Sequence, residues 1–355
     1  MLARFILVLA VVFASCKTPQ TGSQTKDSFG TGAVVSDRHP CSLGASSDIA
    51  QYRDSTYRIP WDVLETAARM SVLAYEPPAT ISREARQLGY TSVDVATVGN
   101  LVVAVVSNDD CVMISFRGTD DLRDWFTNTS VLKKTVRHGK VHSGFLSGAK
   151  ELGRRVSMYL QTQWTPGKKV WVTGHSLGGA LAGVFTYHFA QLVDAEIPAP
   201  EYLVTFGQPA FADEALAKYF SRATHRRYYR VVNNRDIVPR VPPAYKHSGS
   251  LVWFDEGVIK YRPVVTTMAA SVAAASSAPA GAMSMPVADP FAELEPNESD
   301  FAAFMEGASE AAVEQPEDGE SPQDSPVVAA SVRMVDDHSM TEYERMVKNQ
   351  MRNLR

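Results

Sequence analysis

Residues 170–182, VWVTGHSLGGALA, most strongly restrict the fold that this chain can adopt. β-Branched and aromatic residues precede Ser176, Gly174 and Gly178 stand two positions to either side of it, and a helix-compatible segment follows. The pattern predicts a strand that turns sharply at Ser176 and continues directly as a helix. Glycine suits both flanking positions because such a strained turn leaves no room for a Cβ atom there. The turn would hold the serine hydroxyl at the edge of a sheet, where a base can reach it.

Strand and helix patterns alternate on both sides of this turn. We expect strands at 101–106, 111–116, 169–173, 202–206, 227–232, 251–254 and 258–262. We expect helices at 60–74, 142–161, 177–192, 213–220 and 341–353. The first two and the last two strands have the spacing of hairpins, whereas the strands between them alternate with helices. The sequence therefore predicts an α/β fold in which helices cover both faces of a mainly parallel sheet.

The first fifteen residues are typical of a secretory signal. Arg4 is the single positive residue, and the apolar run of about ten residues that follows it is too short to span a bilayer. Small residues stand immediately before Cys16, which resembles the lipobox of bacterial lipoproteins. That resemblance implies that Cys16 is acylated and anchors an exported protein to a membrane. The alternative is ordinary signal cleavage and secretion, with Val12 and Ala14 at the −3 and −1 positions.

Composition divides the rest of the chain. Residues 16–50, rich in Ser, Thr, Gly and Gln, are predicted to form a disordered tether, and 51–263 a globular domain. Residues 264–330 are acidic and rich in Ala, Ser and Pro without helical or strand periodicity, and are predicted to be a disordered insertion. Residues 331–355 are predicted to return to the domain with its closing helix.

Charge and cysteine content restrict the partners and the compartment. Residues 263–332 hold twelve acidic and no basic residues, and removing these charges from the net charge of −4 leaves about +8 on the remainder. Such a diffuse basic bias is compatible with an anionic membrane surface and argues against nucleic acid. In an oxidising compartment Cys41 and Cys111 would form a disulfide or remain as two thiols.

A serine nucleophile needs a base to accept its proton and an acid to orient that base. A glycine-flanked serine can also occur by chance, so these partners decide the interpretation. Asp236 follows the strand expected at 227–232, and would lie on a loop at the carboxyl end of a sheet strand. In α/β-hydrolases the order is Ser, Asp, His, and two histidines follow Asp236, namely His247 and His338.

Four motifs in this order carry a family resemblance: FRGT at 116–119, VHSGFL at 141–146, GHSLG at 174–178 and DIVPRVPP at 236–243. With them the chain resembles the class 3 lipases, the fungal triacylglycerol lipase type of α/β-hydrolase. The resemblance extends over roughly residues 60–262 and the last segment. It implies an α/β-hydrolase-type, mainly parallel sheet flanked by helices.

The resemblance also implies roles for individual residues. Ser176 would be the nucleophile, Asp236 the acid and His338 the base, because the family's base lies near the chain end. A histidine at the place of His247 is frequently structural in the family, yet His247 remains the alternative base. Thr119 and the amide of Leu177 would form the oxyanion hole, and the start of a helix after Ser176 independently favours a negative charge there.

The segment Asp120 to Val131 lies where the family has its lid. Leu122, Trp125 and Phe126 would form the apolar face of a short helix over the site. A mobile helix of this kind would contact a lipid interface, whereas a fixed one would pack on the core.

Together these patterns predict a serine carboxylic-ester hydrolase that acts on acylglycerols or other lipid esters through an acyl-enzyme. A phospholipase A1 or an esterase for soluble esters is the nearest alternative. A surface lipoprotein that binds lipid or a partner without turnover is the alternative from another class. Metal-binding and nucleotide-binding motifs are missing from the sequence, so we expect no cofactor, and no obligate protein partner is inferred.

Overall fold

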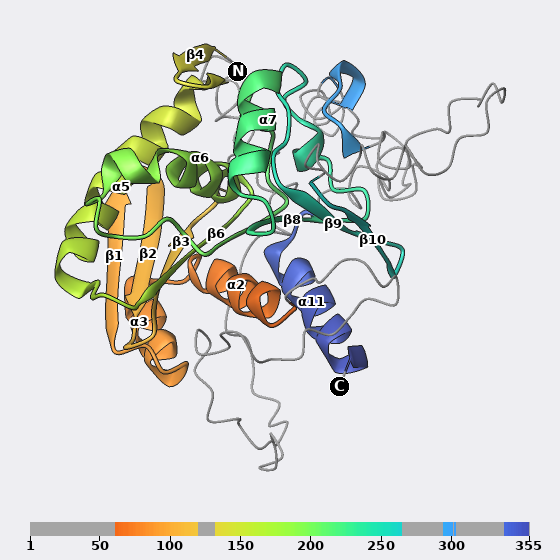
Figure 1. Cartoon of the computed structure of the whole chain (residues 1–355). Helices are drawn as coiled ribbons and strands as arrows, with labels where there is room; N and C mark the ends of the chain where they lie inside the picture. The colour runs from red at the N-terminus through yellow and green to blue at the C-terminus, as the bar shows by residue number, and fades with distance from the viewer. Residues whose placement is uncertain (1–60, 120–131, 265–293, 301, 303–336, 355) are drawn as a thin grey trace, which may run out of the picture.

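An eight-stranded sheet forms the centre of the domain (Figure 1). The computed structural model describes residues 61–119, 132–264, 294–300, 302 and 337–354. Its sheet strands, in spatial order, are β1 (Ser92–Val98), β2 (Leu101–Ser107), β3 (Cys111–Phe116), β6 (Lys169–His175), β7 (Tyr202–Phe206), β8 (Tyr228–Asn233), β9 (Ser250–Asp255) and β10 (Val258–Arg262). The strands from β3 to β9 run parallel, while β1 and β2 at one edge and β10 at the other are antiparallel to their neighbours. The predicted α/β fold is thereby confirmed, with both hairpins where they were expected.

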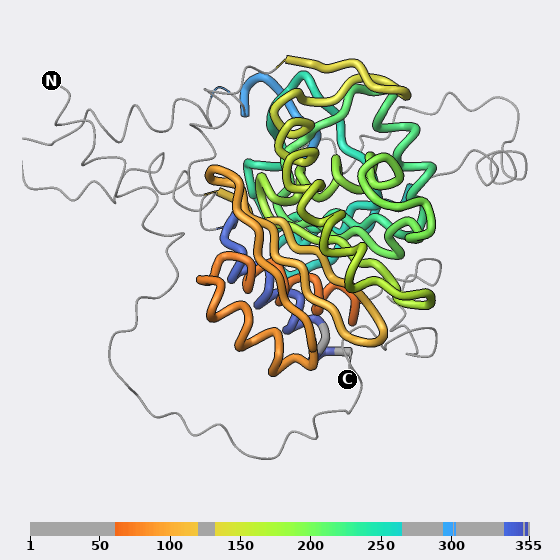
Figure 2. The backbone as a smooth tube through the Cα atoms, turned by 90° about the vertical axis from the view of Figure 1, so that its left-hand side faces the viewer, coloured from red at the N-terminus to blue at the C-terminus, as the bar shows by residue number. Residues whose placement is uncertain are grey.

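Helices cover both faces of this sheet. On one face lie α5 (Ser143–Gln163), α6 (Leu177–Leu192) and α7 (Glu214–Ala223), and on the other α2 (Trp61–Leu73), α3 (Pro78–Gln87) and α11 (Met340–Leu354) (Figures 1 and 2). Side chains alternate between the faces along a strand, so Val103 and Val105 join the first core while Ala104 and Val106 join the second. Because both faces are covered, the central strands are apolar throughout rather than alternating with polar residues.

Helix α6 is the most deeply buried helix. Its residues Leu177–Phe185 are all buried, and glycines and alanines make it narrow enough to pack between α5 and the sheet. A Cβ atom at Gly183 would come within 2.6 Å of the Phe211 ring. The small residues after Ser176 therefore set the position of the helix that begins at the predicted turn.

The two ends of the described chain pack together. Helix α11 lies against α2 on one face of the sheet (Figure 1), and its Tyr343 and Val347 are fully buried in the same core as Leu64 of α2. Residues 337–354 pack on the domain, and the other residues of the segment predicted to return to it lie outside the described residues. His338 lies immediately before α11, so the packing of this helix positions that histidine.

Several elements were not expected from the sequence. Helix α3 and strand β1 precede the first predicted strand, and β4 (Lys133–Val136) pairs with β5 (Gly139–His142) in a separate two-stranded sheet. Helix α3 buries only Ile81 and Ala85, and β4 is rich in lysine. Short, largely exposed elements bury few side chains, so their apolar residues recur too weakly to predict a helix or a strand. Contacts with neighbouring elements stabilise them instead.

One part of the predicted insertion packs on the domain. Leu294 is fully buried with Val232, Leu251 and Trp253, and the prediction of disorder across 264–330 is therefore wrong for residues 294–300. Ion pairs support the contact, at 2.6 Å between Arg262 and Glu295 and at 3.4 Å between Arg240 and Asp300. A single leucine in an acidic, alanine-rich stretch gives no periodic signal, which explains why the sequence did not reveal it.

Other predictions lie outside the described residues. They concern the signal at 1–15, Cys16, the tether at 16–50, the lid residues Leu122, Trp125 and Phe126, and the rest of the insertion. Cys111 is disulfide-bonded, and since Cys16 and Cys41 are the other cysteines of the chain, its partner also lies outside them. Among the described helices, none is long and apolar enough to cross a membrane.

Leu294 provides a test of the contact between residues 294–300 and the sheet. Leu294→Ala should lower the free energy of unfolding by about 2–4 kcal/mol, because it leaves a cavity among apolar side chains. Leu132→Ala, at a residue that is 63% exposed, should change it by less than about 0.5 kcal/mol. Urea unfolding of the two variants measures the difference, and equal effects would contradict this packing.

Candidate active site

Ser176 lies at the turn between β6 and α6 in a strained backbone conformation. Its φ is 57° and its ψ is −131°, in the left-handed half of φ space that residues with a Cβ atom rarely adopt. Gly174 and Gly178 permit the turn: a Cβ atom at Gly174 would approach the Gly178 carbonyl oxygen to 2.4 Å, and one at Gly178 would approach the Phe116 carbonyl oxygen to 2.1 Å. The predicted steric need for both glycines is thus observed.

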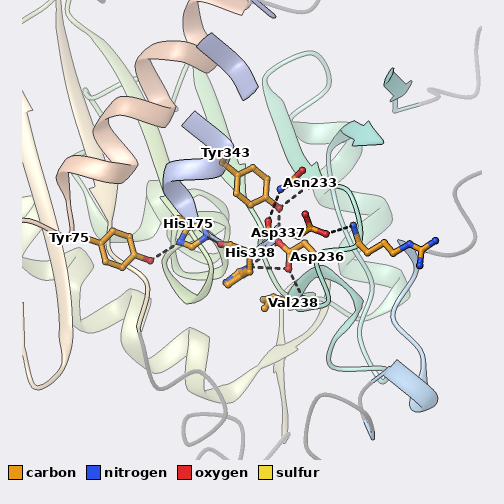
Figure 3. Close-up of polar contacts among 9 residues, drawn as sticks. Tyr75, His175, Asn233, Asp236, Val238, Asp337, His338 and Tyr343 are labelled. Carbon is orange, nitrogen blue, oxygen red and sulfur yellow. Dashed lines mark hydrogen bonds and ion pairs between the residues drawn. The ribbon is translucent and has the colours of Figure 1, made fainter. Parts of the chain in front are cut away.

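Asp236 and His338 form a hydrogen-bonded pair beyond the carboxyl end of β8 (Figure 3). His338 Nδ1 lies 3.0 Å from Asp236 Oδ1 and 2.9 Å from Oδ2. A carboxylate only accepts, so Nδ1 carries the proton, and in the neutral ring Nε2 is left as an acceptor. Within the described part of the chain, His338 Nε2 and Ser176 Oγ are both buried without a hydrogen-bond partner.

The Asp236 carboxylate is fully buried and receives two further hydrogen bonds. The Tyr343 hydroxyl donates to Oδ2 at 2.6 Å, and the Val238 amide donates to Oδ1 at 2.9 Å. Burial and the negative charge of Asp236 hold the pKa of Tyr343 well above its usual value, so the phenol stays protonated and continues to donate. The helical pattern that predicts a helix at 341–353 gives no sign of this polar role of Tyr343.

Three further hydrogen bonds hold His338 through its neighbour Asp337 (Figure 3). The Asp337 carboxylate accepts from Asn234 Nδ2 at 3.1 Å and from the Arg235 amide at 3.2 Å, while its carbonyl accepts from Asn233 Nδ2 at 2.9 Å. These contacts join the start of the last segment to the loop that carries Asp236. No local pattern indicated them, because they connect positions about a hundred residues apart.

His175, the residue before Ser176, binds the backbone of His338 (Figure 3). Its Nε2 lies 2.7 Å from the His338 carbonyl oxygen and must therefore donate, while Nδ1 accepts from the Tyr75 hydroxyl at 2.7 Å. Burial, and next the charge of His338, hold the pKa of His175 well below its usual value, so the ring stays neutral. The chain Tyr75, His175, His338 thus connects the loop after α2 to the last segment, and sequence reasoning missed both outer contacts.

Thr119 and Leu177 are the two residues predicted to form the oxyanion hole. Leu177 is the first residue of α6, where amides have no acceptor within the helix and point toward a negative charge. Gly118 packs on Ser176, since a Cβ atom there would lie 3.0 Å from Ser176 Cβ. Thr119 follows it as the last described residue before the segment 120–131. Both sequence-predicted donors therefore belong to segments that adjoin Ser176.

His247, the alternative base, lies elsewhere. Its Nε2 donates to the Pro239 carbonyl oxygen at 2.6 Å, and burial, with the nearby Arg230 charge, holds its pKa well below the usual value. Nε2 is thus the protonated nitrogen of His247, and its Nδ1 is buried without a hydrogen-bond partner among the described residues. The hydrogen bond to Asp236 belongs to His338 instead. The described residues contain no group of three potential metal ligands.

A parallel sheet with a serine at the turn after β6 and an Asp–His pair beyond β8, two strands along the sheet, defines the α/β-hydrolase class. Within that class, residues 113–246 match the family model of the class 3 lipases.

Two curated lipases are similar to less than half of this chain. The lipase of Rhizomucor miehei is 34% identical over 165 residues, which cover 44% of this chain and 45% of that protein. The secreted mono- and diacylglycerol lipase 1 of Fusarium solani is 33% identical over 165 residues, covering 43% and 48%. A solved structure of Rhizomucor miehei triacylglyceride lipase aligns with a TM-score of 0.45 at 25% identity, over 58% of this chain and 85% of that one. The chain spans about half the length of these curated relatives.

The Tyr343 hydroxyl should contribute to stability through Asp236. Tyr343→Phe removes one donor from a buried carboxylate and should lower the free energy of unfolding at pH 7 by about 1.5–3 kcal/mol. Tyr219→Phe, at a tyrosine that is 41% exposed, is the control and should have little effect. Urea unfolding compares the variants, and a Tyr343→Phe protein as stable as the control would contradict the role of this hydrogen bond.

Buried histidines make stability depend on pH. Burial lowers the pKa of His142 to about 4, against about 6.5 in an unfolded chain. Between these values the unfolded chain binds a proton that the folded one does not, so this part of the stability is present above pH 6.5 and is lost as the pH falls toward 4. His142→Asn keeps an acceptor for the Phe145 amide but has no ring to protonate. The decrease in the free energy of unfolding between pH 7 and pH 4 should therefore be about 3 kcal/mol smaller in this variant than in the wild type. Urea unfolding at pH 7 and pH 4 measures it; an unchanged pH dependence in the variant would contradict the assignment.

Proposed function

We propose that this protein is a serine carboxylic-ester hydrolase that cleaves acylglycerols or other lipid esters through an acyl-enzyme. The hydrogen bond between His338 Nδ1 and the buried Asp236 carboxylate, beside a strained Ser176, is the observation that carries the proposal. The two relatives named as lipases support the lipid-ester substrate class. The metal-free chemistry of a Ser, His and Asp constellation suffices for this reaction.

The reaction begins with attack on the ester. Ser176 Oγ forms a bond to the carbonyl carbon while its proton passes to His338 Nε2, the buried acceptor left by the hydrogen bond to Asp236. Asp236 stabilises the resulting imidazolium, and the Tyr343 and Val238 donors keep the carboxylate ionised and fixed. Because its carboxylate is already oriented before substrate binds, little reorganisation accompanies the proton transfer.

The negative charge then develops on the former carbonyl oxygen. We assign its stabilisation to Thr119 and the amide of Leu177, at the N-terminus of a sixteen-residue helix. Collapse of the tetrahedral intermediate expels the alcohol, which takes the proton from His338. Water, activated by the same histidine, then attacks the acyl-enzyme, releases the carboxylic acid and returns the proton to Ser176.

Export and membrane attachment complete the proposal. A signal of fifteen residues, followed directly by Cys16, supports an exported protein anchored through an acylated cysteine, and a secreted relative supports export. The segment that holds Leu122, Trp125 and Phe126 would add an apolar contact to a lipid interface. The intact mass of the membrane-extracted protein tests the anchor: an unmodified Cys16 would exclude it.

Replacing the two candidate bases separately tests the catalytic assignment. His338→Ala should reduce kcat for p-nitrophenyl ester hydrolysis by at least about 10³-fold, because Ser176 then lacks a proton acceptor. His247→Asn should retain activity within about tenfold, and Ser176→Ala supplies the background rate. Loss of activity in the His247 variant alone would contradict the assignment.

A substrate panel tests the lipid-ester part separately. Short soluble esters, a triglyceride emulsion and phospholipid vesicles are compared, each against Ser176→Ala. Turnover of the emulsion above that of soluble esters supports an acylglycerol substrate, whereas turnover confined to phospholipid or to soluble esters would replace it with a phospholipase A1 or an esterase. An absence of turnover on every substrate would favour a binding protein.

A further inference from the structure

A basic cavity of about 410 Å³ lies on the α7 face of the sheet. Its wall is formed by α7, by the stretch 246–249 that leads into β9, by the end of β10 and by Glu295. It adjoins the first residues of β9, whereas Asp236 follows the last residue of the parallel neighbour β8. The cavity therefore lies toward the opposite end of the strands from the proposed catalytic residues.

Positive charge predominates in the cavity wall. Glu214 pairs with Lys218 at 2.7 Å and Glu295 with Arg262 at 2.6 Å, so each acidic residue of the wall is already neutralised. Arg222 and Lys246 also line the cavity, and neither makes an ion pair with any described residue. The wall thus holds two uncompensated cations.

A third cation lies behind this wall. Arg230 of β8 is 1% exposed, and its side chain shares a sheet face with Tyr228, toward α7. Burial, and next the charge of Arg262, lower the pKa of Arg230 to about 10, and the Arg230 charge in turn lowers the pKa of His247. Arg230 pairs in register with Leu251, which lies two residues after Gly249 of the cavity wall, so Arg230 lies behind this part of the wall.

Arg230 lacks the partners that a buried arginine requires. Its Nε and Nη1 are buried and have no hydrogen-bond partner in the part of the chain that the structure describes. A guanidinium remains charged at neutral pH, and burial of a charge is costly unless hydrogen bonds and an opposite charge compensate it. A fixed cation with free donors beside a basic cavity is the arrangement expected of an anion-binding site.

We propose that this cavity binds a phosphate group between Arg222 and Lys246, with Arg230 behind its wall. Three cations match a doubly charged, tetrahedral oxyanion better than a carboxylate, which brings one charge and two oxygens. The cavity opens to solvent, so the phosphate can belong to a free ion or to a phosphomonoester headgroup of a lipid. The site is separate from the ester-hydrolysing residues and does not depend on the proposed reaction.

Calorimetric titration of the full chain with inorganic phosphate, at constant ionic strength, tests the site. The double variant Arg222→Ala, Lys246→Ala should weaken binding at least tenfold. The matched control is Lys150→Ala, Arg154→Ala, which removes two exposed cations from α5 and should bind phosphate as the wild type does. Arg230→Met should abolish phosphate binding. Because replacing a buried residue can impair folding, the Arg222→Ala, Lys246→Ala variant is the decisive test. Its unchanged rate of ester hydrolysis would show that it is folded.

Vesicles distinguish the two sources of phosphate. In protein that carries Cys16→Ser, and so has no acyl anchor, retention on phosphatidylcholine vesicles that contain phosphatidic acid, but not on pure phosphatidylcholine, would assign a lipid headgroup, provided that the Arg222, Lys246 variant loses it. Binding of inorganic phosphate without such retention would assign a free phosphate. Two outcomes overturn the proposal: no saturable phosphate binding by the wild type, or equal affinities of the cavity variant and the α5 control.

Discussion

The buried carboxylate of Asp236 is the point on which the arrangement of the site depends. Removing an ionised carboxylate from water is unfavourable unless several donors replace the solvent, and here His338, Tyr343 and the Val238 amide provide them. Two of these donors come from the last segment of the chain. The need to satisfy one charge thus brings α11 to the end of β8, although about a hundred residues separate the two in sequence.

Independent contacts then fix the register of that segment. The Asp337 carboxylate binds the loop at Asn234, and His175 binds the His338 carbonyl from the other side. Each doubling of the length of a flexible loop adds only about 0.6 kcal/mol to the free energy of closing it. A long insertion before His338 is therefore compatible with a well-defined site. Part of the insertion even adds to the domain, through Leu294 and its apolar neighbours.

The sequence predicted those features that depend on local pattern. The turn at Ser176 was predicted from its two flanking glycines and from the change from a strand pattern to a helix pattern at this residue. The central strands were predicted from their apolar runs, because strands covered on both faces are apolar throughout. The order of Ser176, Asp236 and a later histidine narrowed the base to two candidates, and family resemblance favoured His338. Tyr75, His175 and Tyr343 were missed as polar partners, since each contacts a residue that only tertiary folding brings near. Strand β1 and Leu294 were missed because partial burial and an isolated apolar residue leave no period.

The central claim is that Ser176 is a nucleophile activated by the pair of His338 and Asp236. The most direct test is covalent labelling of the folded protein with a fluorophosphonate, followed by mass spectrometry of its peptides. The account predicts rapid, stoichiometric modification of Ser176 in the wild type and labelling slowed by orders of magnitude in His338→Ala. Absence of label on Ser176, or labelling that proceeds equally well without His338, would contradict it.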